Sequence, residues 1–337
     1  MNVRVLRVIP IVVCAVVGSG RPSVAQAPVT EFEQIRFHSS FWVNLHFTLY
    51  AEALRTLQSA PDLPQLEAPS REPLRGDLNT AERVAWDEAI AYYRINIARR
   101  NLAYGENMTA IQRALADSSD TLAEASAIGQ DHRRHLLAAA PVYRRYWWSE
   151  HDRAIRTWIA DVSVRLREVG PRASERQAAL LERGWLTVPV RAEITFFGRA
   201  YTVLRREVTL TTMAAGAPNY AGWAGAEMII HEVSHSLTGS DFSGPCDDQI
   251  HREATALGKK VPDGLWHLCL FYITGEVWRS ELAARGVQYE PYLYATGLFD
   301  RSWKSLRVPV ETYLKPYVEG RVSAHIAFRA LIEALPD

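Results

Sequence analysis

The chain has 337 residues, 48% of them apolar, and its 38 Lys and Arg residues balance 38 Asp and Glu residues. This length and apolar content suffice for the core of one large or two modest domains, and they exclude a disordered or fibrous chain. The absence of a basic excess argues against a general nucleic-acid binder.

The first 25 residues have the pattern of a secretory signal peptide. Arg4 and Arg7 precede an apolar run, residues 8–17, that is too short to span a bilayer. Residues 23–25, Ser-Val-Ala, offer small side chains at the positions that a signal peptidase recognises. We therefore expect residues 1–25 to be removed and the mature protein to be secreted or periplasmic, without a membrane span.

Residues 28–180 are predicted to form a helical N-terminal region. Apolar side chains recur at three- and four-residue intervals over 40–59, 79–104, 108–139 and 142–169, the period of a helix packed on one side. We expect a loop where Pro residues cluster between 61 and 73, and a helix break at Pro141.

The pattern changes in residues 181–337, where β-prone runs precede further helices. Residues 186–196 and 201–212 are predicted strands, which could form a hairpin with Gly198 and Arg199 at the bend. Residues 213–220 should be a loop, and the helical pattern returns at Trp223. The predicted fold class is α+β, mainly helical with a small sheet.

The sequence His231-Glu232-Val233-Ser234-His235 contains the spacing His-Glu-x-x-His. On a helix, residues four apart lie on one face, so the two imidazoles can grip one metal ion. Zinc suits two neutral imidazoles, a third ligand and an open position for water. Glu232 projects to one side of that pair, where it can act as general base toward the water.

At these residues the chain resembles the zincin metallopeptidases. The resemblance is firm over residues 231–235 and looser over 186–285. It implies a zincin-like catalytic region over 181–337, zinc as cofactor and a peptide or protein as substrate. In zincins an edge strand before the active-site helix pairs with the extended substrate, and residues 201–212 are our candidate for that strand.

The sequence offers four candidates for the third metal ligand. In the zincin subfamilies it is a His soon after the motif or a Glu on the next helix; Asp241 and Glu253 stand nearest those places. The apolar helix expected to begin at Pro262 carries two strongly polar residues, His267 and Glu276, nine residues apart and therefore on opposite faces. We predict His267 as the ligand, because it comes early in that helix, where zincins usually present theirs.

The sequence also offers candidates for other functional residues. A transition-state donor could be one of four tyrosines that follow the motif, Tyr272, Tyr289, Tyr292 and Tyr294. His132 and His135 could form a second metal pair, although a solvated helix face explains them better. Two cysteines remain in the mature chain, Cys246 and Cys269, and could form one disulfide. The alternative to a zinc peptidase is an exported metal-binding or structural helical protein without catalytic activity.

Overall fold

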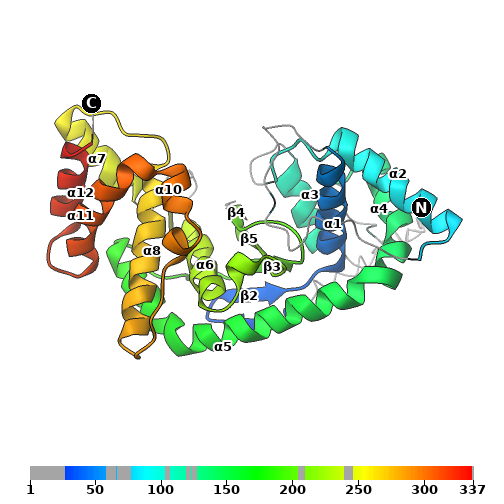
Figure 1. The fold of residues 1–337 in the computed structure, drawn as a ribbon, viewed down its shortest axis with the longest axis horizontal. Coiled ribbons are helices and arrows are strands. Elements are labelled where there is room, and N and C mark those ends of the chain that lie inside the picture. Colours follow the sequence, from blue (N-terminus) through cyan, green and yellow to red (C-terminus); the bar gives the residue numbers. More distant parts are fainter. Residues whose placement is uncertain are drawn as a thin grey trace, which may run out of the picture.

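Helices make up most of the chain and surround one small sheet (Figure 1). The structure, a computed structural model, describes residues 27–57, 66, 77–102, 107–118, 122, 127–203, 209–238 and 246–335. It confirms the α+β class with a mainly helical chain. The predicted signal peptide, residues 1–25, lies outside the described residues, as does most of the expected Pro-rich loop.

The α-helices are α1 (Phe41–Thr56), α2 (Thr80–Asn96), α3 (Met108–Ala116), α4 (Gln130–Tyr143), α5 (Ser149–Leu180), α6 (Trp223–Ser234), α7 (Asp247–Leu257), α8 (Leu265–Ala283), α9 (Tyr292–Ala295), α10 (Leu298–Ser302), α11 (Arg307–Val318) and α12 (Ala324–Glu333). The strands are β1 (Thr30–Phe32), β2 (Ile35–His38), β3 (Val190–Thr195), β4 (Tyr201–Val203) and β5 (Thr209–Ala214). Short 3-10 turns are η2 (Pro218–Tyr220), η3 (His235–Thr238) and η4 (Lys304–Leu306), and η1 (Arg144–Trp148) is a π-helical turn.

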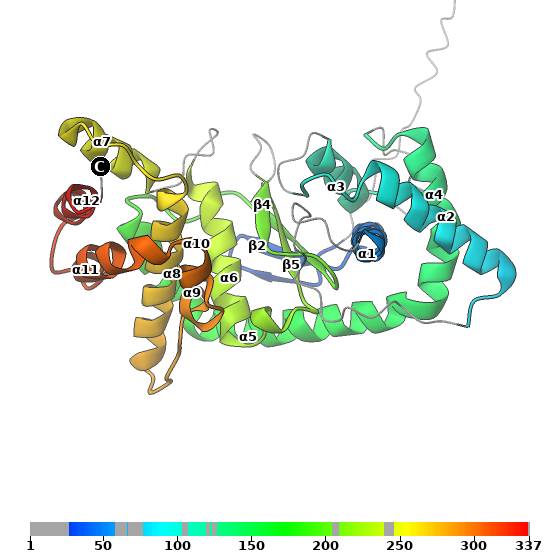
Figure 2. The same cartoon turned by 45° about the horizontal axis from the view of Figure 1, so that its top comes forward.

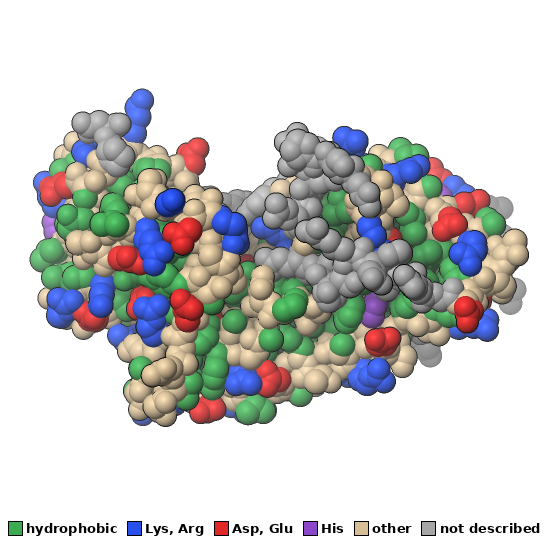
Figure 3. Space-filling model, viewed as in Figure 1, with side chains coloured by type: hydrophobic (Ala, Val, Ile, Leu, Met, Phe, Trp, Pro, Cys, Tyr) green, Lys and Arg blue, Asp and Glu red, His purple; other side chains and the backbone are tan. Residues whose placement is uncertain are grey.

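The 32-residue helix α5 runs along the length of the molecule, beneath the sheet in the view of Figure 1. Helices α1–α4 gather at its N-terminal end and helices α6–α12 at its C-terminal end, and the sheet lies between the two groups in both views (Figure 2). In the space-filling view, basic and acidic side chains are intermixed over both groups on this face, without a large patch of one sign (Figure 3).

The sheet is mixed, with the strand order β1-β2-β3-β5-β4. The three inner strands are parallel, and β1 and β4 pair antiparallel at the two edges. Inner strands β3 and β5 are buried along almost their whole length, as expected of parallel strands covered on both faces. Strands β1 and β2 come from before residue 40 but join the sheet of the second half of the chain through β3.

The predicted hairpin of residues 186–196 and 201–212 is wrong. The first run contains β3, but the second contains two strands, β4 and β5, which pair antiparallel with each other. Strand β3 pairs in parallel with β5, so the bend at Gly198 and Arg199 leads past β5 to the edge. Side-chain propensity marks a segment as extended but does not specify its partner, which explains the error.

The predicted helix break at Pro141 is also wrong. Helix α4 continues through Pro141, and the π turn η1 joins it directly to α5. Proline removes one backbone hydrogen bond and crowds the preceding turn. A π-helical turn a few residues later is one of the known ways in which a helix absorbs such a local disturbance without ending.

Within the part of the chain that the structure describes, the buried apolar side chains form two clusters. One lies around the sheet and helices α5–α12, and the other fills the space between α1, α2, α3 and α4. Tyr201 and Val203 belong to the second cluster. Because side chains alternate along a strand, Thr202 between them points to the opposite side, toward α6.

Candidate metal centre

Helix α6 carries the His-Glu-x-x-His motif deep inside the molecule. The small residues before the motif allow this close packing: a Cβ at Gly225 would lie 2.4 Å from the carbonyl oxygen of Tyr220 and 3.0 Å from Trp158 of α5. His231 is fully buried near the end of α6, and His235 follows at the start of the 3-10 turn η3. The predicted buried helix is therefore present, and it ends at the second histidine.

His267 comes from the first turn of α8, which packs against α6. Its Nε2 atom lies 3.2 Å from Nε2 of His231. One ligand atom from each of His231, His235 and His267 lies within 4.8 Å of the other two. The structure thus brings the three predicted ligands together in one group, which we call the three-histidine cluster, and this group could bind a metal ion.

The spacing of the three rings fits a common metal ion. For tetrahedral bonds of about 2.0–2.1 Å, two ligand nitrogens are about 3.3–3.4 Å apart and the imidazole centroids about 5.2 Å apart. The centroid distances are 5.1 Å for His231–His235, 5.1 Å for His235–His267 and 5.3 Å for His231–His267. The centroid distances agree for all three pairs, although the rings come from three elements, α6, η3 and α8.

Burial also keeps these imidazoles in the form that can donate to a metal. Desolvation lowers the pKa of His231 well below its usual value, with smaller contributions from the neighbouring rings. It lowers the pKa of His235 to about 3 and that of His267 to about 4, the latter with a contribution from the positive charge of Arg199. At neutral pH the three side chains are therefore uncharged and hold lone pairs.

Aromatic side chains hold the rings of the cluster in place. Phe271 stacks on His231 with centroids 3.8 Å apart, and Trp266 stacks on His267 at 4.9 Å. Trp303 contacts His267 edge-on at 6.1 Å. Nδ1 of His231 is buried and has no hydrogen-bond partner among the described residues, so stacking rather than an acceptor orients this ring.

Glu232, the predicted general base and the residue after His231, is buried and is held by the edge strand. The hydroxyl of Thr202 lies 2.9 Å from its Oε2 atom and 2.7 Å from its backbone oxygen. Thr202 was not among the predicted site residues, and the alternating pattern of β4 is the sequence signal that points to it. Phe271 was likewise missed, since one aromatic residue in an apolar helix carries no distinguishing pattern.

The structure places two alternative metal ligands away from the three-histidine cluster. Glu253 is buried between α7 and α12, where its carboxylate accepts a 2.7 Å hydrogen bond from His325. Glu276 lies on the opposite face of α8 from His267 and pairs with Arg279 at 2.8 Å. Asp241 falls outside the described residues.

The four tyrosines proposed as transition-state donors have other contacts. The hydroxyl of Tyr289 donates to Glu227, and Tyr294 lies under the guanidinium groups of Arg279 and Arg307. Burial raises the pKa of Tyr272, which lies near Glu276. The ring of Tyr292 stacks at 6.3 Å on Phe271, the residue that stacks on His231.

The other candidate features also lie apart from the cluster. His132 shares a hydrogen bond of 2.8 Å with Tyr93, whereas His135 bonds to a backbone oxygen of its own helix, so the pair does not converge. Cys246 and Cys269 are both buried free thiols, and burial raises the pKa of each.

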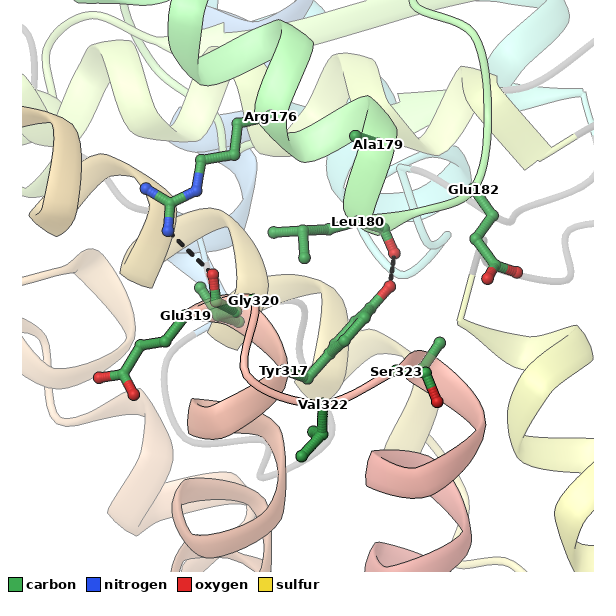
Figure 4. A pocket seen from close by; sticks show the side chains of 11 residues that line it. Arg176, Ala179, Leu180, Glu182, Tyr317, Glu319, Gly320, Val322 and Ser323 are labelled. Atoms are coloured by element: carbon green, nitrogen blue, oxygen red, sulfur yellow. Dashed lines mark hydrogen bonds between the residues drawn. The ribbon is translucent and has the colours of Figure 1, made fainter.

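A surface pocket of about 450 Å³ lies between the end of α5 and the turn that joins α11 to α12 (Figure 4). Its polar side chains hold these elements together: Arg176 donates to the oxygen of Val318 at 2.8 Å, and Tyr317 donates to that of Leu180. No histidine lines this pocket. We therefore regard it as a packing feature and the three-histidine cluster as the candidate site.

Comparison of the chain with known protein families, with curated proteins and with solved structures finds no match. None of the helices in the described ranges combines the length and apolar character needed to cross a bilayer.

Proposed function

We propose that this chain is a zinc-dependent peptidase that acts outside the cytoplasm. The observation that carries the proposal is the convergence of His231, His235 and His267, and the buried Glu232 follows His231 directly in the chain. Catalytic zinc sites commonly have three protein ligands, including sets of three histidines, and keep a fourth position for water or substrate.

The donor set favours zinc over the hard cations. Calcium and magnesium prefer oxygen ligands, whereas neutral imidazoles suit zinc and its transition-metal neighbours. The described ligands are three nitrogens without a carboxylate among them. Zinc bound there would polarise a substrate carbonyl and lower the pKa of water to near neutrality.

Glu232 would act as the general base in this chemistry. Its carboxylate, 5% exposed, can take a proton from water and later deliver it to the leaving amine. The three imidazoles are uncharged at neutral pH because of burial, so they do not compete with Glu232 for that proton.

A peptide is the substrate class that the edge of the sheet favours. Strand β4 is the last strand in the sheet order, and it packs against α6 beside Glu232. An extended peptide can add to such an edge through main-chain hydrogen bonds. Of the predicted substrate-binding segment, residues 201–212, the part that forms this edge is therefore β4, Tyr201–Val203, since β5 is an inner strand.

The decisive experiment compares wild type with Glu232→Gln. Both proteins are expected to contain one zinc per chain by plasma mass spectrometry, and only the wild type should cleave members of a proteome-derived peptide library read by mass spectrometry. Glu253→Gln is the matched control, because this buried glutamate lies away from the cluster. Zinc without cleavage in the wild type would favour a non-catalytic metal-binding protein, and absence of zinc would favour a structural one.

A further inference from the structure

We infer that Thr202 is a positioning residue for Glu232, linking the edge strand β4 to the orientation of the general base. This inference rests on the proposed function for the role of Glu232, but the contact itself is structural. Thr202 Oγ1 lies 2.7 Å from the backbone oxygen and 2.9 Å from Oε2 of Glu232, 30 residues away in the chain.

Counting protons defines the direction of these hydrogen bonds. A threonine hydroxyl has one proton, so Thr202 donates to one of the two Glu232 oxygens at a time. Its oxygen also lies 3.0 Å from Oγ1 of Thr211, the cross-strand partner on β5. Thr211 can therefore donate to Thr202 while Thr202 donates to Glu232, a short chain in which each hydroxyl strengthens the next bond.

The position of the Thr202 hydroxyl is fixed from the other face of β4. The neighbouring Tyr201 is buried in the α1–α4 cluster and its hydroxyl donates to Gln112 of α3. Val203 is buried in the same cluster. These two anchors limit rotation of the strand, and the branched Cβ of threonine limits rotation of the side chain itself.

A contact that orients a general base should affect turnover more than substrate binding. Misplacement of a catalytic group by about 1 Å can cost about 100-fold in rate. Because β4 is also the strand at which we expect the peptide to add, Thr202 would connect the substrate-binding edge with the proton-accepting carboxylate. Loss of its hydroxyl is therefore expected to lower kcat while KM changes little.

The test uses the mature protein, without residues 1–25, and three variants of it. Thr202→Val keeps the shape but removes the hydroxyl, and Thr202→Ser keeps the hydroxyl. Thr212→Val is the control, since Thr212 lies on the neighbouring strand β5 and its hydroxyl is within hydrogen-bond distance of the backbone oxygens of residues 199 and 201 rather than of Glu232.

We expect Thr202→Val to retain one zinc per chain, to lose about 10- to 100-fold in kcat and to keep KM within about twofold. Thr202→Ser should recover most of that loss, and Thr212→Val should turn over like the wild type. Equal kcat values for Thr202→Val and Thr212→Val would overturn the inference, as would a serine variant no faster than the valine variant. If Thr202→Val does not fold, Thr202→Ala takes its place.

Crystal structures of zinc-loaded wild type and Thr202→Val separate this inference from the proposed function. If the wild type cleaves no peptide, the proposed function is wrong, and the position of the Glu232 carboxylate then decides the inference. A carboxylate rotated or displaced in Thr202→Val supports a positioning role, whereas an unchanged carboxylate overturns it.

Discussion

The Nε2 atoms of His231 and His267 lie 3.2 Å apart although 36 residues separate them in the chain. Two uncharged imidazoles at this distance either share one proton or point to a common cation. The centroid of the His235 ring lies 5.1 Å from that of each of the other two rings, which favours a common cation. This relationship depends on how α8 is seated against α6, because each helix alone supplies an incomplete ligand set.

His267→Ala should therefore abolish stoichiometric zinc binding. Removal of one of three protein ligands is expected to weaken zinc affinity by more than about 100-fold, since even the outer partners of metal ligands contribute about 10- to 100-fold. Competition with a chromophoric chelator measures the affinity. Glu253→Gln, which alters a buried carboxylate bonded to His325, should bind zinc like the wild type, and the reverse result would make Glu253 the ligand instead.

Gln177 of α5 holds α6 and α8 in this arrangement. Its Nε2 atom donates to Ser234 Oγ at 2.6 Å and to Thr274 Oγ1 at 2.9 Å, and the three side chains are buried. Each hydroxyl in turn donates its proton to a carbonyl one turn earlier in its own helix, so its oxygen is free to accept from the amide. The amide thus joins α6, which carries His231 and leads directly into His235, to α8, which carries His267.

Gln177→Met is expected to reduce both stability and zinc affinity. Two buried hydroxyl oxygens would lose their donor, which costs about 1–3 kcal/mol in unfolding free energy. Small shifts of α8 against α6 should lower zinc affinity by about tenfold, the lower end of the effect seen for supporting residues. Gln249→Met is the control, because Gln249 donates to Glu182 and contacts neither ligand helix through that bond. Equal zinc affinities in the two variants would refute this role.

The parts of the fold that depend on local pattern could be predicted from the sequence. Helices α1 and α2 follow from the spacing of apolar residues, although α2 ends at Asn96 rather than near 104. Helix α8 follows from its long apolar run, although it begins at Leu265 rather than at Pro262. The His-Glu-x-x-His pair is local to one helical turn. His267 could be proposed because a polar residue in an otherwise apolar helix needs a partner.

The parts that depend on long-range pairing could not be predicted. Strands β1 and β2 have three and four residues, too short for an alternating pattern to stand out. The order of the inner strands depends on which buried faces meet after folding. The contacts of Thr202 with Glu232 and of Gln177 with Ser234 join residues 30 and 57 positions apart, and single polar residues give no sign of their partners.

The metal-free protein should lose stability as the pH falls below about 6.5. Seven histidines have a lowered pKa, chiefly because of burial, namely His38, His46, His132, His151, His231, His235 and His267. In the unfolded chain these histidines bind protons at a higher pH than in the folded protein, so acid favours unfolding. Each histidine with a folded pKa of about 4 lowers the unfolding free energy by about 2 kcal/mol at pH 5. Urea denaturation with a chelator at pH 7, 6 and 5 tests this, and a constant midpoint would contradict it.

Glu227 should have the opposite pH dependence, and it lies one turn before His231 on α6. Its Oε2 atom accepts hydrogen bonds from the hydroxyl of Tyr289 at 2.5 Å and from the backbone nitrogen of Tyr292 at 3.0 Å. Burial raises the pKa of Glu227 to about 7. The folded protein therefore binds this proton more tightly than the unfolded chain, and stability falls as the pH rises from about 4.5 through 7.

Glu227→Gln removes that titration while its amide oxygen can still accept from Tyr289. Relative to the wild type, the variant should gain on the order of 3 kcal/mol in unfolding free energy between pH 5 and pH 8, because only the wild type must ionise a buried carboxyl over that interval. The comparison uses the change between the two pH values, since any cost of burying the amide nitrogen is the same at both. An identical difference between variant and wild type at pH 5 and pH 8 would show that Glu227 does not titrate in this range.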